Sequence, residues 1–330
     1  MSDSNYTPPF AITERIIDLV AQIGEQIGLI SVTAQMDANP HLRRENQLKT
    51  IHSSLAIENN TLSLEQMTAI IDGKRVLGPP NEIVEVKNAF EAYNHLLSFN
   101  PYSIPDMLHA HQILMNGLVK EAGVFRSGGV GVFDGLLVVH MAPPAKRVPV
   151  LIDQLVAWAE HSTTHPLIKS CVFHYEFEFI HPFADGNGRM GRMWQTLLLY
   201  QWKKIFAWLP VETLIKERQS EYYKAINEST KKTDSAPFIE FLLQAISDAL
   251  SEVITTAQVN EQVNAQVNLL LVKLGRETLS AKELMSRVGL KHRQNFQKNY
   301  LKPALEQRAI EMTIPDKPNS NQQKYRRVKN

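Results

Sequence analysis

The strongest constraint on the fold is a pair of apolar segments separated by one short polar loop. The first segment, Ile168 to Ile180, is apolar almost all round a helix, and the second carries apolar residues at helical spacing. The loop and the start of the second segment read HPFADGNGRMGR and cover His181 to Arg192. This pattern predicts a buried helix, a polar loop and a second helix, and it favours an all-α bundle.

The loop has the composition of an anion-binding turn. Gly186 and Gly188 leave backbone N–H groups unhindered, and Asn187 between them tolerates a left-handed conformation. The second helix should begin near Gly188 or Arg189, so that its positive dipole end faces the loop. A glycine-flanked loop at a helix N-terminus most often binds phosphate.

Four side chains of this segment fit nucleotide-phosphate transfer. Arg189 and Arg192 lie three apart on one helix face and can donate charge-assisted hydrogen bonds. Asp185 offers the hard oxygen that Mg²⁺ takes beside phosphate oxygens. His181 has a side chain whose ordinary pKa suits proton abstraction near neutral pH. An alternative, a metal site of His174, His181 and Asp185, lacks the spacing of zinc hydrolases.

The segment resembles the signature of the Fic family at every defined position, from the histidine to the second arginine. In that family it marks transfer of AMP from ATP to a hydroxyl of a target protein. The resemblance implies that His181 is the catalytic base and that Asp185 holds Mg²⁺ or Mn²⁺. It also implies nucleotide binding by Gly186, Asn187, Gly188, Arg189 and Arg192. In related sequences an aromatic residue at the position of Tyr223 borders the adenine.

A second resemblance lies near the N-terminus. Ser54 and Glu58 are four apart and share a helical face, which by spacing alone is typical of a polar surface that ends at an Asn cap. The Ser-x-x-x-Glu-Asn pattern resembles the inhibitory motif of Fic proteins that carry an N-terminal inhibitory helix. The resemblance implies that Glu58 pairs with Arg192, where two anions compete for one guanidinium, so the resting enzyme should be weak.

A hairpin is expected over residues 123–144, where strand-forming residues flank the turn signal Asp134-Gly135. Taken by itself, a lone hairpin in a helical chain is typical of a surface loop rather than of a core sheet. In Fic proteins a hairpin at this place is the flap that aligns the target chain by strand-like pairing. The resemblance assigns flap docking to Val130, Gly131, Val132 and Phe133.

The remaining pattern predicts the domain organisation. We expect N-terminal helices with the inhibitory helix over 1–100, a Fic catalytic core over 101–250, a linker or helix over 251–279 and a winged-helix-like domain over 280–330. One helix is expected over 205–227. Three Gln-Val-Asn repeats between 258 and 268 suit a solvated linker, or a narrow valine stripe for packing or homodimerisation.

The C-terminal portion is basic. Ser280 caps a helix, a longer helix is expected over 291–307, and strands over 310–314 and 325–328. From 281 to 330 the chain has 12 Lys or Arg against 4 Asp or Glu, whereas the whole chain has a net charge of +1. DNA is therefore a candidate partner, and protein interaction is the alternative use of such a domain.

Composition indicates the class of protein and the compartment in which it works. With 44% hydrophobic and 21% charged residues the chain is typical of a soluble globular protein. One cysteine excludes an internal disulfide and fits a reducing compartment. The start carries no signal pattern, and no run is long enough to span a bilayer, so we expect a cytoplasmic protein without membrane contact.

Three functions are compatible with these patterns. The first is transfer of AMP from ATP to Ser, Thr or Tyr hydroxyls of an unidentified target and of the protein itself. The second uses the same site to remove AMP, with Glu58 orienting a water. The third is a DNA-binding regulator whose Fic part senses nucleotide.

Overall fold

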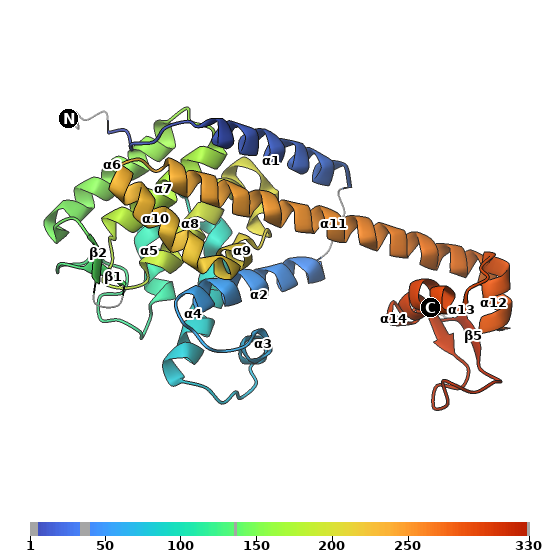
Figure 1. Ribbon diagram of the computed structural model, residues 1–330. Coiled ribbons are helices and arrows are strands. Elements are labelled where there is room, and N and C mark those ends of the chain that lie inside the picture. Colours follow the sequence, from blue (N-terminus) through green and yellow to red (C-terminus); the bar gives the residue numbers. More distant parts are fainter. Residues whose placement is uncertain (1–5, 34–39, 135–136, 329–330) are drawn as a thin grey trace. The chain divides into compact units, whose positions relative to one another are not determined.

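The computed structural model describes residues 6–33, 40–134 and 137–328, and the chain divides into two compact units, Met1–Ser251 and Glu252–Asn330. The first unit is a helical bundle with one two-stranded hairpin, and the second combines short helices with a three-stranded sheet (Figure 1). The predicted all-α fold with a hairpin is confirmed.

The helices of the first unit come in two groups, before and after a hairpin that lies between α5 and α6 in the sequence and at the edge of the bundle (Figure 1). Before the hairpin come α1 (Glu14–Thr33), α2 (Pro40–Ile57), α3 (Leu64–Ile71), α4 (Pro80–His95) and α5 (Ile104–Leu114). After it come α6 (Val148–His161), α7 (Pro166–Ile180), α8 (Asn187–Trp202), α9 (Val211–Glu217), α10 (Gln219–Lys232) and α11 (Ala236–Leu274). Short 3₁₀ helices cover Leu96–Ser98, Ala145–Arg147 and Lys204–Ala207.

Helix α7 forms the centre of the first unit, as its apolar composition predicts. Cys171, Phe173 and Phe177 are fully buried, and Gln195 of α8 donates to the Cys171 sulfur at 3.7 Å. Trp194 of α8 is also fully buried, and its indole N–H donates to the carbonyl of Pro101 at 2.9 Å. Cys171 is the one cysteine of the chain, and burial raises the pKa of its thiol to about 12. The buried helix pair α7–α8 therefore gives the intervening loop a rigid base.

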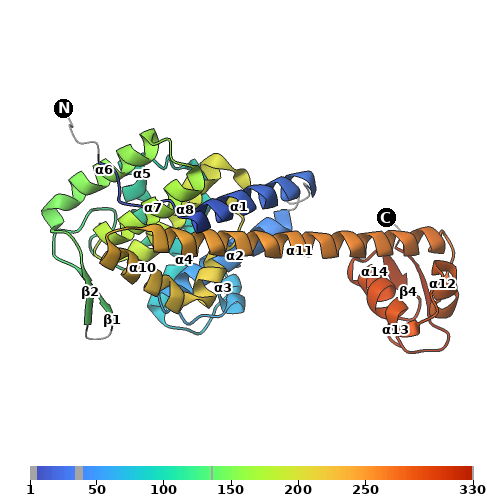
Figure 2. The ribbon, with the colours of Figure 1, turned by 45° about the horizontal axis from the view of Figure 1, so that its top comes forward.

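Helix α1 lies alongside the first part of α11 (Figures 1 and 2). The buried Gln26 amide donates to the Ser247 carbonyl at 3.0 Å and to the Ser251 hydroxyl at 2.8 Å, and Ser247 donates back to it at 3.2 Å. A polar side chain this deep is stable because each of its groups has a partner.

The C-terminal end of α2 is held by residues from α9 and α10. Lys216 donates to the carbonyl of Ala56 at 2.8 Å, and Gln219 donates to the carbonyl of Ile57 at 2.9 Å. The Ala56 carbonyl also accepts from the Asn59 N–H at 3.2 Å, in the turn that ends the helix. A cation beside these last carbonyls also complements the helix dipole. The last turn of α2, which carries Glu58 at its end, is thereby fixed in place.

The hairpin consists of β1 (Gly131–Asp134) and β2 (Leu137–Met141), which pair antiparallel. Gly131 pairs with Met141 and Val132 with His140, after which a bulge shifts the register. The predicted turn at Asp134-Gly135 extends beyond the described residues, as do the side chains of Gly131, Val132 and Phe133.

The helix expected over 205–227 is wrong as a single element. A 3₁₀ turn, α9 and α10 replace it, with breaks at Pro210 and Arg218. The apolar spacing continues across both breaks and therefore hides them. Pro210 lacks an N–H and is placed just before α9 rather than inside a helix.

The second unit orders its strands β3-β5-β4, all antiparallel. Its elements are β3 (Leu279–Ser280), α12 (Ala281–Val288), α13 (Arg293–Phe296), a π-helical turn (Gln297–Leu301), α14 (Lys302–Glu306), β4 (Ile310–Met312) and β5 (Lys324–Arg327). The Gln-Val-Asn repeats belong to α11, and Val267 packs into the core of this unit with Leu284 and Phe296.

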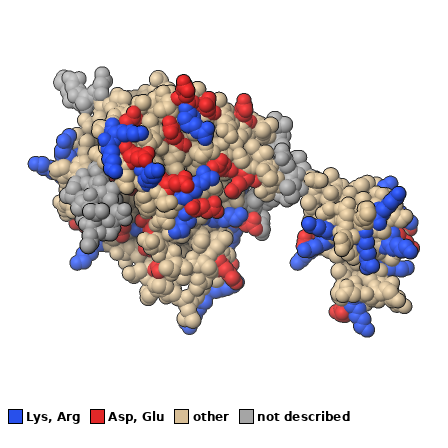
Figure 3. Space-filling model, in the orientation of Figure 1, with Lys and Arg blue, Asp and Glu red and all other residues tan. Residues whose placement is uncertain are grey.

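Charge is distributed differently over the two units. In the view of Figure 3 the second unit shows mostly Lys and Arg, whereas the first shows both signs. Across the described parts of the chain, none of the helices has the length and apolar character that a bilayer crossing requires.

Candidate active site

Two left-handed residues shape the loop between α7 and α8. His181 ends α7 with φ 52° and ψ 63°, and Gly186 precedes α8 with φ 85°. The helix begins at Asn187, one residue before the predicted start near Gly188 or Arg189, and the left-handed conformation that Asn187 would tolerate is adopted by Gly186. A Cβ on Gly186 would also lie 2.7 Å from the sulfur of Met115, so only glycine fits there.

The Asn187 side chain closes the loop between α7 and α8 through two hydrogen bonds. Its side-chain oxygen accepts from the Phe183 N–H at 2.9 Å, and its amide group donates to the Phe183 carbonyl at 2.9 Å. Because both ends of this amide are engaged, Asn187 fixes the shape of the loop and does not itself extend toward a ligand.

His181 is held in one orientation by a backbone contact. Its Nδ1 lies 3.3 Å from the carbonyl oxygen of Glu178. A carbonyl oxygen can only accept, so in the neutral ring Nδ1 carries the hydrogen and Nε2 keeps a lone pair. This is the tautomer that a general base needs.

His111 supports the loop from beneath, and its role was not predicted from the sequence. Its Nδ1 accepts from the Gly123 N–H at 2.9 Å, its Nε2 donates to the Asp185 carbonyl at 3.0 Å, and its ring stacks on Phe183. Burial is the main cause that lowers the pKa of His111 to about 4, so the ring is neutral near pH 7. Only a neutral imidazole can accept at one nitrogen and donate at the other, as His111 does here.

Arg192 is fully buried and bound by α2. Its Nη2 donates to Glu58 Oε1 at 2.8 Å and to the Ser54 carbonyl at 3.0 Å, and its Nε donates to the Ser54 hydroxyl at 3.1 Å. Burial is the largest single influence and would lower the pKa of Arg192, but Glu58, Tyr222 and Glu178 together outweigh it and hold that pKa above its usual value. The pairing implied by the inhibitory motif is thus present.

The Glu58 carboxylate lies directly over the first turn of α8. A Cβ placed on Gly188 would collide with Glu58 Oε1 and lie 3.0 Å from Arg192 Nη1. The space that Gly188 leaves open is therefore the space that the carboxylate occupies, at the positive end of the helix dipole.

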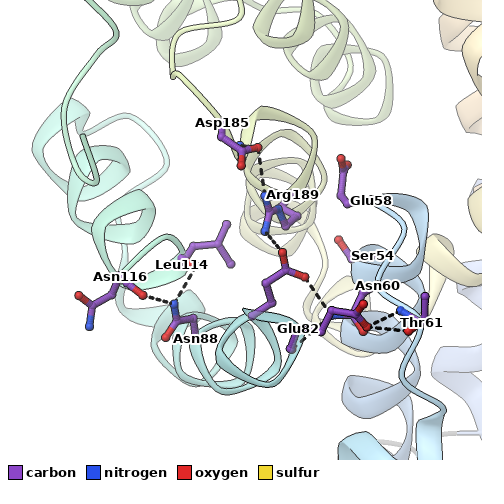
Figure 4. A network of polar contacts seen from close by, with 12 residues as sticks. Ser54, Glu58, Asn60, Thr61, Glu82, Asn88, Leu114, Asn116, Asp185 and Arg189 are labelled. Atoms are coloured by element: carbon purple, nitrogen blue, oxygen red, sulfur yellow. Dashed lines mark hydrogen bonds and ion pairs between the residues drawn. The ribbon is translucent and has the colours of Figure 1, made fainter. Parts of the chain in front are cut away.

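Arg189 takes part in a separate polar network (Figure 4). Its guanidinium lies 3.2 Å from Asp185 and 3.5 Å from Glu85 of α4, whose second oxygen accepts from Asn60 at 2.9 Å. The Nε and Nη1 atoms of Arg189 are buried and make no hydrogen bond with the described residues. Such donors are suited to an additional anion. Glu85 carries no sequence signal, because its partner Arg189 is remote along the chain.

Asp185 supplies one carboxylate, so it fits a metal ion only when a bound phosphate contributes further oxygens. Its side chain is 60% exposed, and Oδ1 accepts from the Gly186 N–H at 2.6 Å. Among the described residues no three His, Cys, Asp or Glu side chains gather as a metal site. Mg²⁺ commonly binds one or two carboxylates plus phosphate oxygens, so a single carboxylate beside an anion site suits it.

Two further predictions concern aromatic and histidine side chains. Tyr223 is 41% exposed, and its ring packs edge-on against Tyr222 with the ring centroids 5.3 Å apart. Partial burial and then the Glu58 carboxylate raise the pKa of Tyr223. His174 is fully buried and bonds Gln195 at 2.7 Å and Tyr222 at 3.2 Å. His174 thus belongs to the core, and a metal site with His181 and Asp185 does not form among these residues.

Comparisons with known proteins agree with this geometry. The Fic/DOC family model matches residues 101–199, and the model of the Filamentation induced by cAMP protein Fic-like C-terminal domain matches 265–327. A Fic family protein from Desulfovibrio desulfuricans G20 is 53% identical, with a TM-score of 0.76 over 98% of this chain and 99% of that chain. The Fic-1 fragment from C. elegans, 22% identical with a TM-score of 0.60 over 74% of each chain, shares the fold.

Curated relatives match over part of their length. The protein adenylyltransferase Fic of Drosophila melanogaster is 31% identical over 266 residues, which are 73% of this chain and 51% of the relative. The Drosophila sechellia protein of the same name matches equally. The chain spans about half the length of these relatives. The matched segments contain the loop built above, and the chain belongs to the Fic family.

Proposed function

We propose that this protein transfers AMP from ATP to Ser, Thr or Tyr hydroxyls of target proteins and of itself, and that Glu58 keeps it weakly active at rest. The observation that carries the proposal is the buried Arg192 guanidinium, which Glu58 binds 2.8 Å away at the start of α8. The Drosophila relatives named protein adenylyltransferase Fic support the reaction class.

The first turn of α8 supplies the phosphate site. Its backbone N–H groups have no partner within the helix, and Arg192 and Arg189 add positive charge. The buried Nε of Arg189 makes no hydrogen bond with the described residues and is free to donate. The β- and γ-phosphates of ATP would take these donors. Tyr223 would border the adenine, as the family resemblance implies.

His181 supplies the base. Its Nε2 lone pair accepts the proton of the target hydroxyl while that oxygen attacks the α-phosphorus in line. A new oxygen–phosphorus bond forms, the bond to the bridging oxygen breaks, and pyrophosphate leaves. Bound Mg²⁺ or Mn²⁺, held by Asp185, would neutralise phosphate charge. Positioning and charge stabilisation supply most of the acceleration.

Glu58 and the γ-phosphate compete for Arg192. Both are anions, and the buried guanidinium can pair closely with one of them at a time. Because Lys216 and Gln219 hold the end of α2, the carboxylate stays in place until that helix end moves.

The test compares wild type with Glu58→Gly, Glu58→Gly/His181→Ala and His181→Ala, using ATP labelled at the α-phosphate and a cell lysate. We expect label on protein to rise strongly in Glu58→Gly and to vanish in both His181 variants. Label at the γ-phosphate is the matched control: kinases of the lysate transfer it, so its incorporation should be the same with all four proteins. Equal labelling by all four proteins would refute the proposal.

The same preparation separates the alternatives. Each α-labelled nucleotide in turn identifies the donor. Release of AMP from a previously labelled target by wild type but not by Glu58→Gly would favour AMP removal. Salt-dependent binding of a defined DNA by the basic second unit, without protein labelling, would favour a nucleotide-sensing regulator.

A further inference from the structure

Arg126 lies in the segment that leads from α5 to the hairpin and is almost completely buried, at 3% exposure. Its backbone N–H donates to the Pro182 carbonyl at 2.9 Å. Its side chain donates from Nε to the His181 carbonyl at 2.7 Å and from Nη2 to the Ile180 carbonyl at 3.3 Å. One residue thus binds three successive carbonyls around the end of α7.

The same guanidinium reaches both stems of the hairpin. Nη1 donates to the Gly128 carbonyl at 2.8 Å, before β1, and Nη2 donates to the Pro143 carbonyl at 2.5 Å, after β2. The two strands and the end of α7 are therefore joined through a single side chain. Its planar, forked donors make this geometry possible.

Arg126 has no carboxylate partner. Among the residues that the structure describes, no ion pair includes it, and every acceptor of its side chain is a backbone carbonyl. Desolvation correspondingly lowers the pKa of Arg126. The carbonyls at the end of α7 carry the negative end of a helix dipole, which gives this buried cation its compensation.

We propose that Arg126 is a positioning residue for the transfer step, which holds the hairpin at a fixed offset from the His181 imidazole. The inference rests on the proposed function, in which the hairpin aligns the target chain and His181 takes the proton of its hydroxyl. Arg126 binds the carbonyl of His181 itself and so fixes the left-handed backbone from which the imidazole extends, while the Glu178 carbonyl orients the ring. The hydrogen bonds that the Arg126 side chain makes within the described ranges all go to backbone carbonyls outside the residues assigned to phosphate binding.

The contacts of Arg126 predict different effects on nucleotide binding and on the transfer step. Loss of the guanidinium should leave nucleotide binding intact, because Arg189, Arg192 and the first turn of α8 keep their partners. It should slow transfer, because the hydroxyl and the base are no longer held at reacting distance. Displacement of reacting groups by about 1 Å costs on the order of a hundredfold in rate.

The experiment uses the full chain with Glu58→Gly as parent and adds Arg126→Lys or Arg126→Gln. Lysine keeps the positive charge, but its single ammonium group cannot reach the carbonyls at the end of α7 and those of both hairpin stems at once. We expect kcat for target labelling to fall by roughly tenfold to a hundredfold in both, with ATP affinity within about twofold of the parent. Arg287→Lys, an exposed arginine of the second unit paired with Glu277, is the matched control and should behave as the parent.

Hydrogen exchange of the hairpin amides supplies a readout that needs no activity. Arg126→Lys should speed exchange of the hairpin amides by roughly tenfold, while amides of α7 and α8 stay protected. Unchanged hairpin exchange, or labelling kinetics equal to the parent, would overturn the proposal. If the Glu58→Gly parent itself labels nothing with any nucleotide, the proposed function fails, and the exchange data still decide whether Arg126 holds the hairpin.

Discussion

Glu212, in the first turn of α9, is a carboxylic acid buried from water. Its side chain is 2% exposed, its Oε2 has no hydrogen-bond partner among the described residues, and the Thr196 hydroxyl lies 3.4 Å from Oε1. Desolvation is the main cause that raises the pKa of Glu212 to about 7. The folded chain thus holds a proton on Glu212 that the unfolded chain releases at lower pH.

Stability should therefore fall as pH rises from about 4.5 to about 7, because the folded state binds the proton more tightly across that window. Glu212→Gln removes the titration. Relative to wild type, its free energy of unfolding should improve by about 3 kcal/mol between pH 4.5 and pH 8. Urea unfolding at several pH values measures this. The exposed Glu221→Gln is the control, and parallel curves for wild type and Glu212→Gln would contradict the prediction.

Ser54 provides a graded test of inhibition. Its hydroxyl accepts from Arg192 Nε at 3.1 Å, whereas the neighbouring Ser53 hydroxyl contacts Thr213 at 3.2 Å. A hydrogen bond to a charged group contributes about 1.5–3 kcal/mol, so Ser54→Ala should weaken the hold on Arg192 and raise labelling roughly tenfold, less than Glu58→Gly. Ser53→Ala should not raise it. Labelling by Ser54→Ala at the wild-type level would contradict this role.

At the level of whole elements, local sequence predicted most helices because polar loops and prolines bracket them. Helix α7 contains the whole predicted apolar segment from Ile168 to Ile180 and ends at its last residue. The breaks around α9 were missed because the apolar spacing runs through them. The hairpin was predicted because its turn signal and strand formers are contiguous in sequence.

Some residues of the candidate site could be predicted from the sequence, and others could not, for the same reason. The loop from His181 to Arg192 is a continuous string, so its residues are visible in the sequence. The pairing of Glu58 with Arg192 was accessible only through family resemblance, since 134 residues separate them. The contacts of Arg126 and His111 depend on backbone carbonyls 55 and 74 residues away, which no side-chain pattern encodes.

Helix α12 offers a test confined to one element. Ser280 Oγ accepts from the Glu283 N–H at 3.3 Å, and Glu283 accepts from the Ser280 N–H at 2.8 Å, a reciprocal capping box. Ser280→Ala should destabilise the second unit by about 1 kcal/mol. Ser286→Ala, at an exposed position of the same helix, is the control. Thermal unfolding followed by circular dichroism measures both, and equal midpoints for the two variants would argue against the cap.

At the scale of the whole molecule, each unit has its own core. The first is centred on α7 and α8, and the second on residues such as Leu284, Phe296 and Leu301. Independent cores predict two calorimetric transitions rather than one. Ser280→Ala should lower the midpoint of only one of them, and ATP should raise only the other. A single transition that shifts as a whole with either change would show that the units unfold together.

The buried thiol of Cys171 has a practical consequence. A soluble alkylating reagent can reach this sulfur only when α7 leaves its place, since the side chain is 0% exposed and the native thiolate is scarce. Wild-type protein therefore reports the opening frequency of its own catalytic scaffold through its alkylation rate, with no introduced label. Any nucleotide that binds the native state should slow that reaction in proportion to its occupancy.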